Sequence, residues 1–200
     1  MSAGVPEMID AVFDLAGESV PADYPFELWD ALVALVPELA GDAATGVLPL
    51  RTTGSGSGML LPRRAKLVVR LPAALAGEVG GLSGRELDIG DSRLRLGQGR
   101  LREIVPYSTI HAHLVTGVAD EVAFIEEVSA VLAGSGIAAG LICGRRNTLA
   151  GTDRRIGGFS LGIHDLKPED SLRLQYTGLG SDRRYGCGVF VPYKVIADLH

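Results

Sequence analysis

The order in which strand and helix signals follow one another constrains the fold more than any other feature, because the same order occurs twice along the 200 residues. Apolar runs or alternation indicate strands, and apolar residues spaced by three and four indicate helices. In the first half we expect strands at 8–15, 46–52, 66–71 and 87–96, the last as a hairpin turning at Gly90-Asp91, with helices at 25–36 and 72–82. In the second half we expect strands at 110–116, 138–143, 156–163 and 188–192, with helices at 121–133 and 168–176.

Each half therefore follows the order β-α-β-β-α-β, which is the ferredoxin-like order. We predict an α+β protein with two tandem ferredoxin-like domains, 1–106 and 107–200, joined near Pro106. Local chemistry supports the first helix, because Asp23 is a candidate N-cap residue, Pro25 suits the first turn and Pro37 ends the apolar pattern. Trp29 falls on the apolar face of this helix and is expected in the core.

Composition excludes several classes of protein. With 46% hydrophobic and 22% charged residues, the chain can bury one sizeable core or two smaller ones. No segment approaches the roughly 20 apolar residues of a membrane helix, and the N-terminus has no signal-peptide pattern, so we expect a cytoplasmic protein. Cys143 and Cys187 are too few for a disulfide framework or a zinc site, and both are expected to be buried or half-buried.

Charge is unevenly distributed along the chain. The net charge of -5 argues against a protein that coats nucleic acid indiscriminately. Acidic residues concentrate at 7–38 and 120–127, whereas the arginines come in pairs at 63–64, 145–146, 154–155 and 183–184. This asymmetry is typical of a protein that binds RNA with one face, although each pair alone could equally be a solvated turn.

The densest local signal is a glycine-rich segment at 178–192. Its closely spaced glycines would let the backbone approach a phosphate chain, and its two arginines could add charged hydrogen bonds. The segment is therefore either a phosphate-binding loop or simply a glycine-rich hairpin turn. The residues concerned are Gly178, Gly180, Arg183, Arg184, Gly186 and Gly188.

This segment, with the apolar strand and proline that follow it, resembles the C-terminal glycine-rich loop of the CRISPR repeat-processing endoribonucleases, the Cas6 family. Shorter segments resemble a short type I subfamily in the same order, so the similarity spans nearly the whole chain. These are Phe13-Asp14-Leu15, Val20-Pro21-Ala22-Asp23, 28–32, Val69-Arg70-Leu71-Pro72, Leu87-Asp88-Ile89, Leu94-Arg95-Leu96-Gly97, Leu114-Val115-Thr116, Gly144-Arg145-Arg146 and Ser171-Leu172-Arg173-Leu174-Gln175.

The resemblance implies two ferredoxin-like domains that hold the repeat hairpin of precursor CRISPR RNA. Cleavage would follow attack of a ribose 2′-hydroxyl on the adjacent phosphate, with neither a metal ion nor a cofactor. It also implies other subunits of a type I CRISPR surveillance complex as partners. The protein would then supply positioning, proton transfer and charge stabilisation.

The residue expected to transfer a proton is the point where this sequence departs from the family. Family members often carry an Asp-His pair at the start of the first helix, and this chain has Asp23-Tyr24 there. A tyrosine with a pKa near about 10 is a poor base at neutral pH, so Tyr24 either relays a proton or packs at the helix entry. His111 and His113 lie two apart on a predicted strand, hence on one face, and either could supply the imidazole.

A second set of candidate RNA-binding residues flanks the hairpin predicted at 138–163. Arg145, Arg146, Arg154 and Arg155 lie in or beside it, and a hairpin that carries arginines can enter an RNA groove or follow phosphates. The triplet Arg63, Arg64 and Lys66 could continue the RNA path, but a solvated strand start explains it equally well.

Two other functions fit parts of the sequence. A protein that retains the processed hairpin without cutting it is favoured by Tyr24. The segment 183–188 also matches a loose coenzyme A pyrophosphate pattern of acetyltransferases, but that pattern opens a helix. Because Pro192 would end a helix early, the acetyltransferase-like function ranks below both RNA functions.

Overall fold

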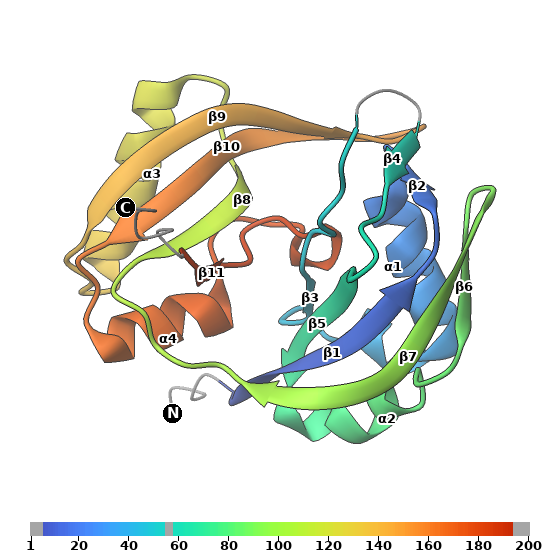
Figure 1. The fold of residues 1–200 in the computed structure, drawn as a ribbon. Helices are drawn as coiled ribbons and strands as arrows, with labels where there is room; N and C mark the ends of the chain where they lie inside the picture. The colour runs from blue at the N-terminus through green and yellow to red at the C-terminus, as the bar shows by residue number, and fades with distance from the viewer. Residues whose placement is uncertain (1–5, 55–57, 194–200) are drawn as a thin grey trace, which may run out of the picture.

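The computed structural model describes residues 6–54 and 58–193, which form two domains side by side (Figure 1). The first domain contains a five-stranded antiparallel sheet in the order β3-β5-β1-β7-β6. Its strands are β1 (Met8–Ala16), β3 (Gly46–Val47), β5 (Lys66–Pro72), β6 (Glu86–Ile89) and β7 (Ser92–Glu103). Its helices are α1 (Tyr24–Leu35) and α2 (Ala76–Gly80), with short 3-10 turns η1 (Pro37–Gly41) and η2 (Ala73–Leu75). A separate pair joins β2 (Ser19–Pro21) to β4 (Gly58–Leu60).

The second domain contains a four-stranded antiparallel sheet in the order β11-β8-β10-β9. Its strands are β8 (Ile110–Thr116), β9 (Gly140–Ala150), β10 (Arg155–His164) and β11 (Val191–Pro192). Its helices are α3 (Glu121–Gly134) and α4 (Pro168–Thr177), and η3 (Arg183–Tyr185) is a single 3-10 turn in the glycine-rich segment. The predicted tandem ferredoxin-like fold is confirmed, because each sheet places the first and third strands of the unit in its centre.

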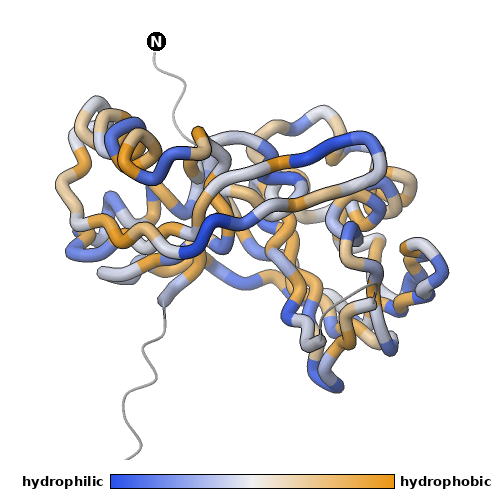
Figure 2. Tube along the Cα trace, turned by 90° about the horizontal axis from the view of Figure 1, so that it is seen from above, coloured by the Kyte–Doolittle hydropathy of each residue, from blue (hydrophilic) through white to orange (hydrophobic). Residues whose placement is uncertain are grey.

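Each domain has its own hydrophobic core. One buried cluster draws on the first sheet and α1, including Phe13, Leu28 and Leu32, and a second joins α3 to the second sheet through Phe124 and Phe159. The hydropathy-coloured trace carries hydrophobic stretches in both lobes (Figure 2). These cores lie on either side of Pro106, the position predicted to join the domains.

Several local predictions need correction. Asp23 precedes α1 but makes no side-chain cap hydrogen bond. The strand predicted at 46–52 is reduced to Gly46–Val47, and the last strand is reduced to Val191–Pro192. By contrast β9 runs through the arginine-rich segment to Ala150, because it pairs with β10 from Gly140 to Ala150. Part of the predicted glycine-serine loop, 55–57, lies outside the described residues.

The extended β9–β10 hairpin reaches from the second domain across to the first. In Figure 1 it passes over the space between the sheets toward the β2–β4 pair. A side chain on Gly151, at its turn, would overlap the ring of Phe26 near the start of α1. The Phe26 ring also contacts the Tyr185 ring of the glycine-rich segment, so the hairpin turn, this segment and the start of α1 meet at the candidate site.

Candidate functional site

The backbone of the glycine-rich segment bonds mostly within the protein. The Gly178 N–H donates to the Leu174 carbonyl, the Gly186 N–H to the Arg183 carbonyl and the Gly188 N–H to the Leu114 carbonyl. The sequence suggested that these three N–H groups donate to a phosphate chain, but each of them already donates to a carbonyl of the protein. Gly188 has φ of +64°, and a side chain there would overlap the Leu179 carbonyl. Close packing therefore explains why this position is a glycine. Of the four predicted glycines, only Gly180 has an N–H group without a partner among the described residues.

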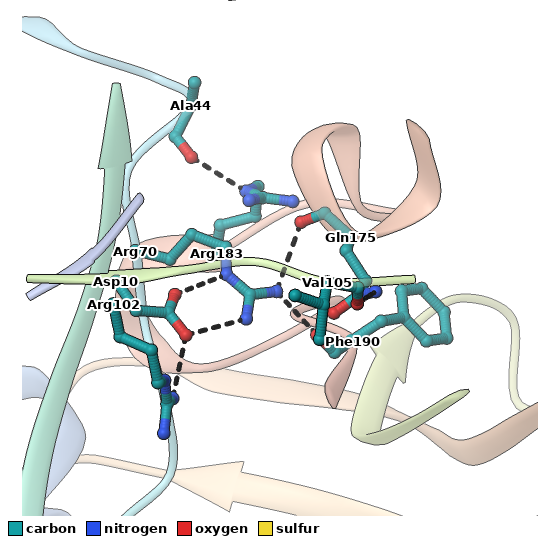
Figure 3. Close-up of polar contacts among 8 residues, drawn as sticks. All are labelled: Asp10, Ala44, Arg70, Arg102, Val105, Gln175, Arg183 and Phe190. Carbon is teal, nitrogen blue, oxygen red and sulfur yellow. Dashed lines mark hydrogen bonds and ion pairs between the residues drawn. The ribbon is translucent and has the colours of Figure 1, made fainter. Parts of the chain in front are cut away.

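Arg183 is buried, although the sequence suggested that it could donate charged hydrogen bonds to a phosphate chain. Its side chain is 7% exposed, and Nε donates to the Ala44 carbonyl at 3.0 Å (Figure 3). Burial, followed by the charge of Arg70, lowers the pKa of Arg183 to about 10. Its Nη1 and Nη2 atoms are buried and have no hydrogen-bond partner among the described residues. Arg183 therefore links the loop to the first domain, and RNA binding by its side chain stays a prediction.

The other arginine of this pair lies on the surface beside two aromatic rings. The Arg184 guanidinium lies 5.4 Å from the centre of the Tyr185 ring. The Arg154 guanidinium, from the hairpin turn, lies 5.5 Å from the same ring and 5.6 Å from the ring of Phe26. We call Phe26, Arg154, Arg184 and Tyr185 the arginine–aromatic cluster.

Contacts between the two rings and between the guanidinium groups and the ring faces hold the cluster together. The rings of Phe26 and Tyr185 meet edge to face with centres 4.8 Å apart. Arg154 Nη1 donates to the Tyr185 hydroxyl at 2.6 Å. Both guanidinium groups remain exposed, so their charge is available to an anion while the rings fix their positions.

Tyr24 lies beneath this cluster rather than in it. A small hollow is lined by Tyr24, Leu28 and Pro49 together with Arg184 and Tyr185. The Tyr24 side chain is 6% exposed, and its hydroxyl accepts a hydrogen bond of 2.8 Å from the Leu50 N–H. Burial raises its pKa to about 12. The hydroxyl is thus protonated at neutral pH and supports packing at the helix start, so a catalytic role for Tyr24 stays a prediction that these properties oppose.

Comparison with known proteins decides the family. The Cas6 CRISPR family model matches residues 9–195. The CRISPR-associated endonuclease Cas6 of Myxococcus xanthus (strain DK1622) is 34% identical over 186 residues, covering 92% of this chain and 81% of that protein. This chain belongs to the Cas6 family.

Solved structures show that the Cas6 fold is retained at low identity. A CRISPR associated protein Cas6 superposes with a TM-score of 0.67 at 10% identity, covering 94% of this chain and all of that one. A CRISPR endoribonuclease Cse3 bound to 19 nt RNA superposes with a TM-score of 0.56 at 14% identity, covering 94% of this chain and 98% of that one. These likenesses establish the shared fold.

The two histidines are not members of the cluster in this Cas6 protein. His111 and His113 are on one face of β8, where His111 is half-buried and His113 is exposed. Burial, followed by the nearby charge of His113, lowers the pKa of His111. Within the described residues, no hydrogen bond or ion pair joins either imidazole to the cluster. Through its carbonyl, His113 accepts a hydrogen bond from Asn147 Nδ2 on β9 at 2.8 Å.

The remaining predicted arginines follow the long hairpin. Arg145 and Arg146 lie on β9 and Arg155 starts β10, and all three side chains are exposed. Only Arg154 of the four hairpin arginines joins the cluster. No described group of three or more His, Cys, Asp or Glu side chains could hold a metal ion. No helix of the described chain is long and apolar enough to cross a membrane.

Sequence reasoning missed the two aromatic members of the cluster. Phe26 falls inside the helix predicted at 25–36 and Tyr185 inside the glycine-rich segment, and neither was given a functional role. The position of Tyr185 between an arginine pair and a glycine was a usable signal, because an aromatic ring beside exposed guanidinium groups favours cation–π contact.

Proposed function

We propose that this Cas6 protein is an endoribonuclease that binds the repeat hairpin of precursor CRISPR RNA and cleaves it without a metal ion. The chemistry would be attack of a ribose 2′-hydroxyl on the adjacent phosphate. Its support is the family, the endonuclease named among its relatives and a protein of the same fold bound to RNA.

The arginine–aromatic cluster is the observation that carries this proposal. It gathers two exposed guanidinium groups and a tyrosine hydroxyl where three elements of two domains meet. A guanidinium donates paired hydrogen bonds that match the geometry of a phosphate, so Arg154 and Arg184 are the best candidates to hold the scissile phosphate. Arg145, Arg146 and Arg155 would continue the RNA path along the hairpin.

We rank the candidates for the general base by the solvent exposure of their side chains. The buried hydroxyl of Tyr24 has a raised pKa, whereas His113 is exposed on the same strand as Thr116. Thr116 Oγ1 accepts a hydrogen bond from the Ser181 N–H in the glycine-rich segment at 2.7 Å. His113 is therefore our first candidate for the general base, followed by His111 and then Tyr24.

Single-turnover cleavage of repeat RNA tests these roles. Arg184→Ala and His113→Ala should each slow cleavage by about 10²-fold or more, while Tyr24→Phe should leave the rate within a few-fold of wild type once folding is verified. Arg173→Ala is the matched control, since Arg173 is an exposed arginine of the second domain outside the cluster. Wild-type rates in both His113→Ala and Arg184→Ala would mean that the site lies elsewhere.

A second function is favoured by the burial of Tyr24. A protein that keeps the repeat hairpin without cutting it, as a subunit of a type I CRISPR surveillance complex, needs no base at the start of α1. Tight hairpin binding by wild type without any cleavage product would establish this function instead. The coenzyme A pattern finds no support, because Arg183–Tyr185 is a single 3-10 turn and no helix starts there.

A further inference from the structure

The helix-free face of the first sheet has two ends with different surroundings. Along β1, Phe13 and Leu15 point into the core, so Asp10, Val12 and Asp14 point to the opposite face. At one end of this face Asp10 and its partner Arg70 are buried against the second domain. At the other end, where Asp14 pairs in register with Lys66, the face is open and forms a hollow of about 320 Å³.

This hollow is strongly basic on a chain of net negative charge. Its lining includes Arg63, Arg64, Lys66 and Arg95 against one carboxylate, Asp14. Asp14 is already paired with Lys66, and Arg100 Nη1 lies 4.0 Å from it. Within residues 6–54 and 58–193, the side chains of Arg63, Arg64 and Arg95 form no ion pair. Three exposed arginines thus converge on one hollow with their charge uncompensated.

We infer that this hollow is a second RNA site, which binds phosphates of a single-stranded segment flanking the repeat hairpin. The inference rests on the proposed function. None of the lining residues belongs to the arginine–aromatic cluster, so the hollow extends the binding surface of the first domain beyond the site that holds the scissile phosphate. The backbone of a single strand is flexible enough to place a phosphate inside a hollow. A duplex is stiffer and presents its phosphates on a broad convex surface, which fits a hollow less well.

The chemistry of the hollow favours RNA over a protein partner. Arg63 and Arg64 are adjacent in the turn before β5 and line the same hollow as Arg95 of β7, an arrangement suited to neighbouring phosphates of one chain. Among the apolar residues of the lining, Leu15, Ala65 and Leu96 are buried, and the exposed Ala16 is too small to act as an anchor. A protein interface of useful affinity needs exposed aromatic or aliphatic anchors, and this hollow offers none among its described lining.

The test compares three RNAs with three proteins. The RNAs are the repeat hairpin alone and the same hairpin with a 5′ or a 3′ single-stranded flank of about 8 nucleotides. The proteins are wild type, Arg63→Glu/Arg64→Glu, and the matched control Lys167→Glu/Arg173→Glu, which makes the same charge change at exposed positions near α4. Equilibrium affinity is measured at several salt concentrations.

We expect one flank to tighten binding to wild type by about 10-fold, and the Arg63→Glu/Arg64→Glu variant to lose that gain while binding the bare hairpin like the control. The salt dependence of the flanked RNA should also become shallower by about 1.4 in log–log slope, from two lost single-strand contacts. An equal flank gain in the variant and the control overturns the inference, as does tighter binding of an acidic peptide than of the flank. If wild type does not bind the bare hairpin at all, the proposed function itself fails.

Discussion

Asp10 and Arg70 form a buried two-point ion pair that also joins the two domains. Arg70 Nε lies 2.7 Å from Asp10 Oδ1, and Arg70 Nη2 lies 3.2 Å from Asp10 Oδ2. The remaining nitrogen of Arg70, Nη1, donates to the carbonyls of Gln175 at 3.2 Å and Phe190 at 2.6 Å in the second domain (Figure 3). One side chain of the first sheet thereby contributes to the contact between the two domains.

Removing Arg70 should be costly. The change Arg70→Met leaves the Asp10 carboxylate buried with only the half-exposed Arg102 beside it, and two carbonyls lose their donor. We expect the free energy of unfolding to fall by about 3 kcal/mol in urea titrations. The control Arg93→Ala removes an exposed pair with Asp88 and should leave that free energy nearly unchanged. Equal stabilities of the two variants would show that the buried pair does not join the domains.

The glycine at position 178 should be irreplaceable. It has φ of +68° and ψ of -169°, a conformation essentially restricted to glycine, and a side chain would overlap the guanidinium of Arg183. Gly178→Ala should therefore cost about 2 kcal/mol or more in unfolding free energy and weaken hairpin binding, because the loop that carries Arg184 shifts. Gly157→Ala, at a strand position with open space, is the comparison and should remain close to wild type. A stable Gly178→Ala protein with normal RNA affinity would refute this packing of the loop.

Replacing Tyr24 should affect stability more than catalysis. Tyr24→Phe leaves the buried Leu50 N–H without its acceptor, which should cost about 1–3 kcal/mol in thermal or urea unfolding. The exposed Tyr107→Phe change provides the baseline for loss of a tyrosine hydroxyl. A stability equal to the baseline, combined with a large loss of cleavage, would return Tyr24 to the active site.

The half-buried His111 should make stability depend on pH. Its pKa is lower in the folded protein than the usual 6.5, so the unfolded chain binds the proton more tightly. The contribution of neutral His111 is therefore complete above pH 6.5 and declines as the pH falls toward and through the folded value. Urea titrations at several pH values should show a steeper acid loss for wild type than for His111→Gln. Parallel curves would mean that His111 is solvated in the native state.

Much of the fold could be predicted because its periodic signals are local. The strand at Ile110–Thr116 and the helix at Glu121–Gly134 follow directly from apolar spacing. The second half of β9 was missed because Arg145, Arg146 and Asn147 carry no apolar alternation, and the strand there depends on pairing with β10. Such pairing joins residues through tertiary structure and leaves little trace in a short window of sequence.

The site was only partly predictable for a related reason. The arginine pairs and the glycine-rich segment drew attention to Arg154 and Arg184, which do lie together. Arg183 is buried whereas Arg184 is exposed. Because the two residues are adjacent and identical, composition cannot predict which of them is buried. The interdomain role of Arg70 had one signal, a charged residue inside the apolar run 67–71, but its partners Gln175 and Phe190 lie more than 100 residues away.

Metal-independent cleavage of the repeat hairpin can be tested through the identity of the RNA ends that the protein makes in a chelator. Wild-type protein is incubated with repeat RNA from a CRISPR array beside its gene, in excess chelator, and the 3′ ends of the upstream products are analysed. Attack by a 2′-hydroxyl predicts a single cut ending in a 2′,3′-cyclic phosphate, at a rate unchanged by added magnesium. Products that require a divalent ion, or that end in a 3′-hydroxyl, would rule out metal-independent attack by the 2′-hydroxyl.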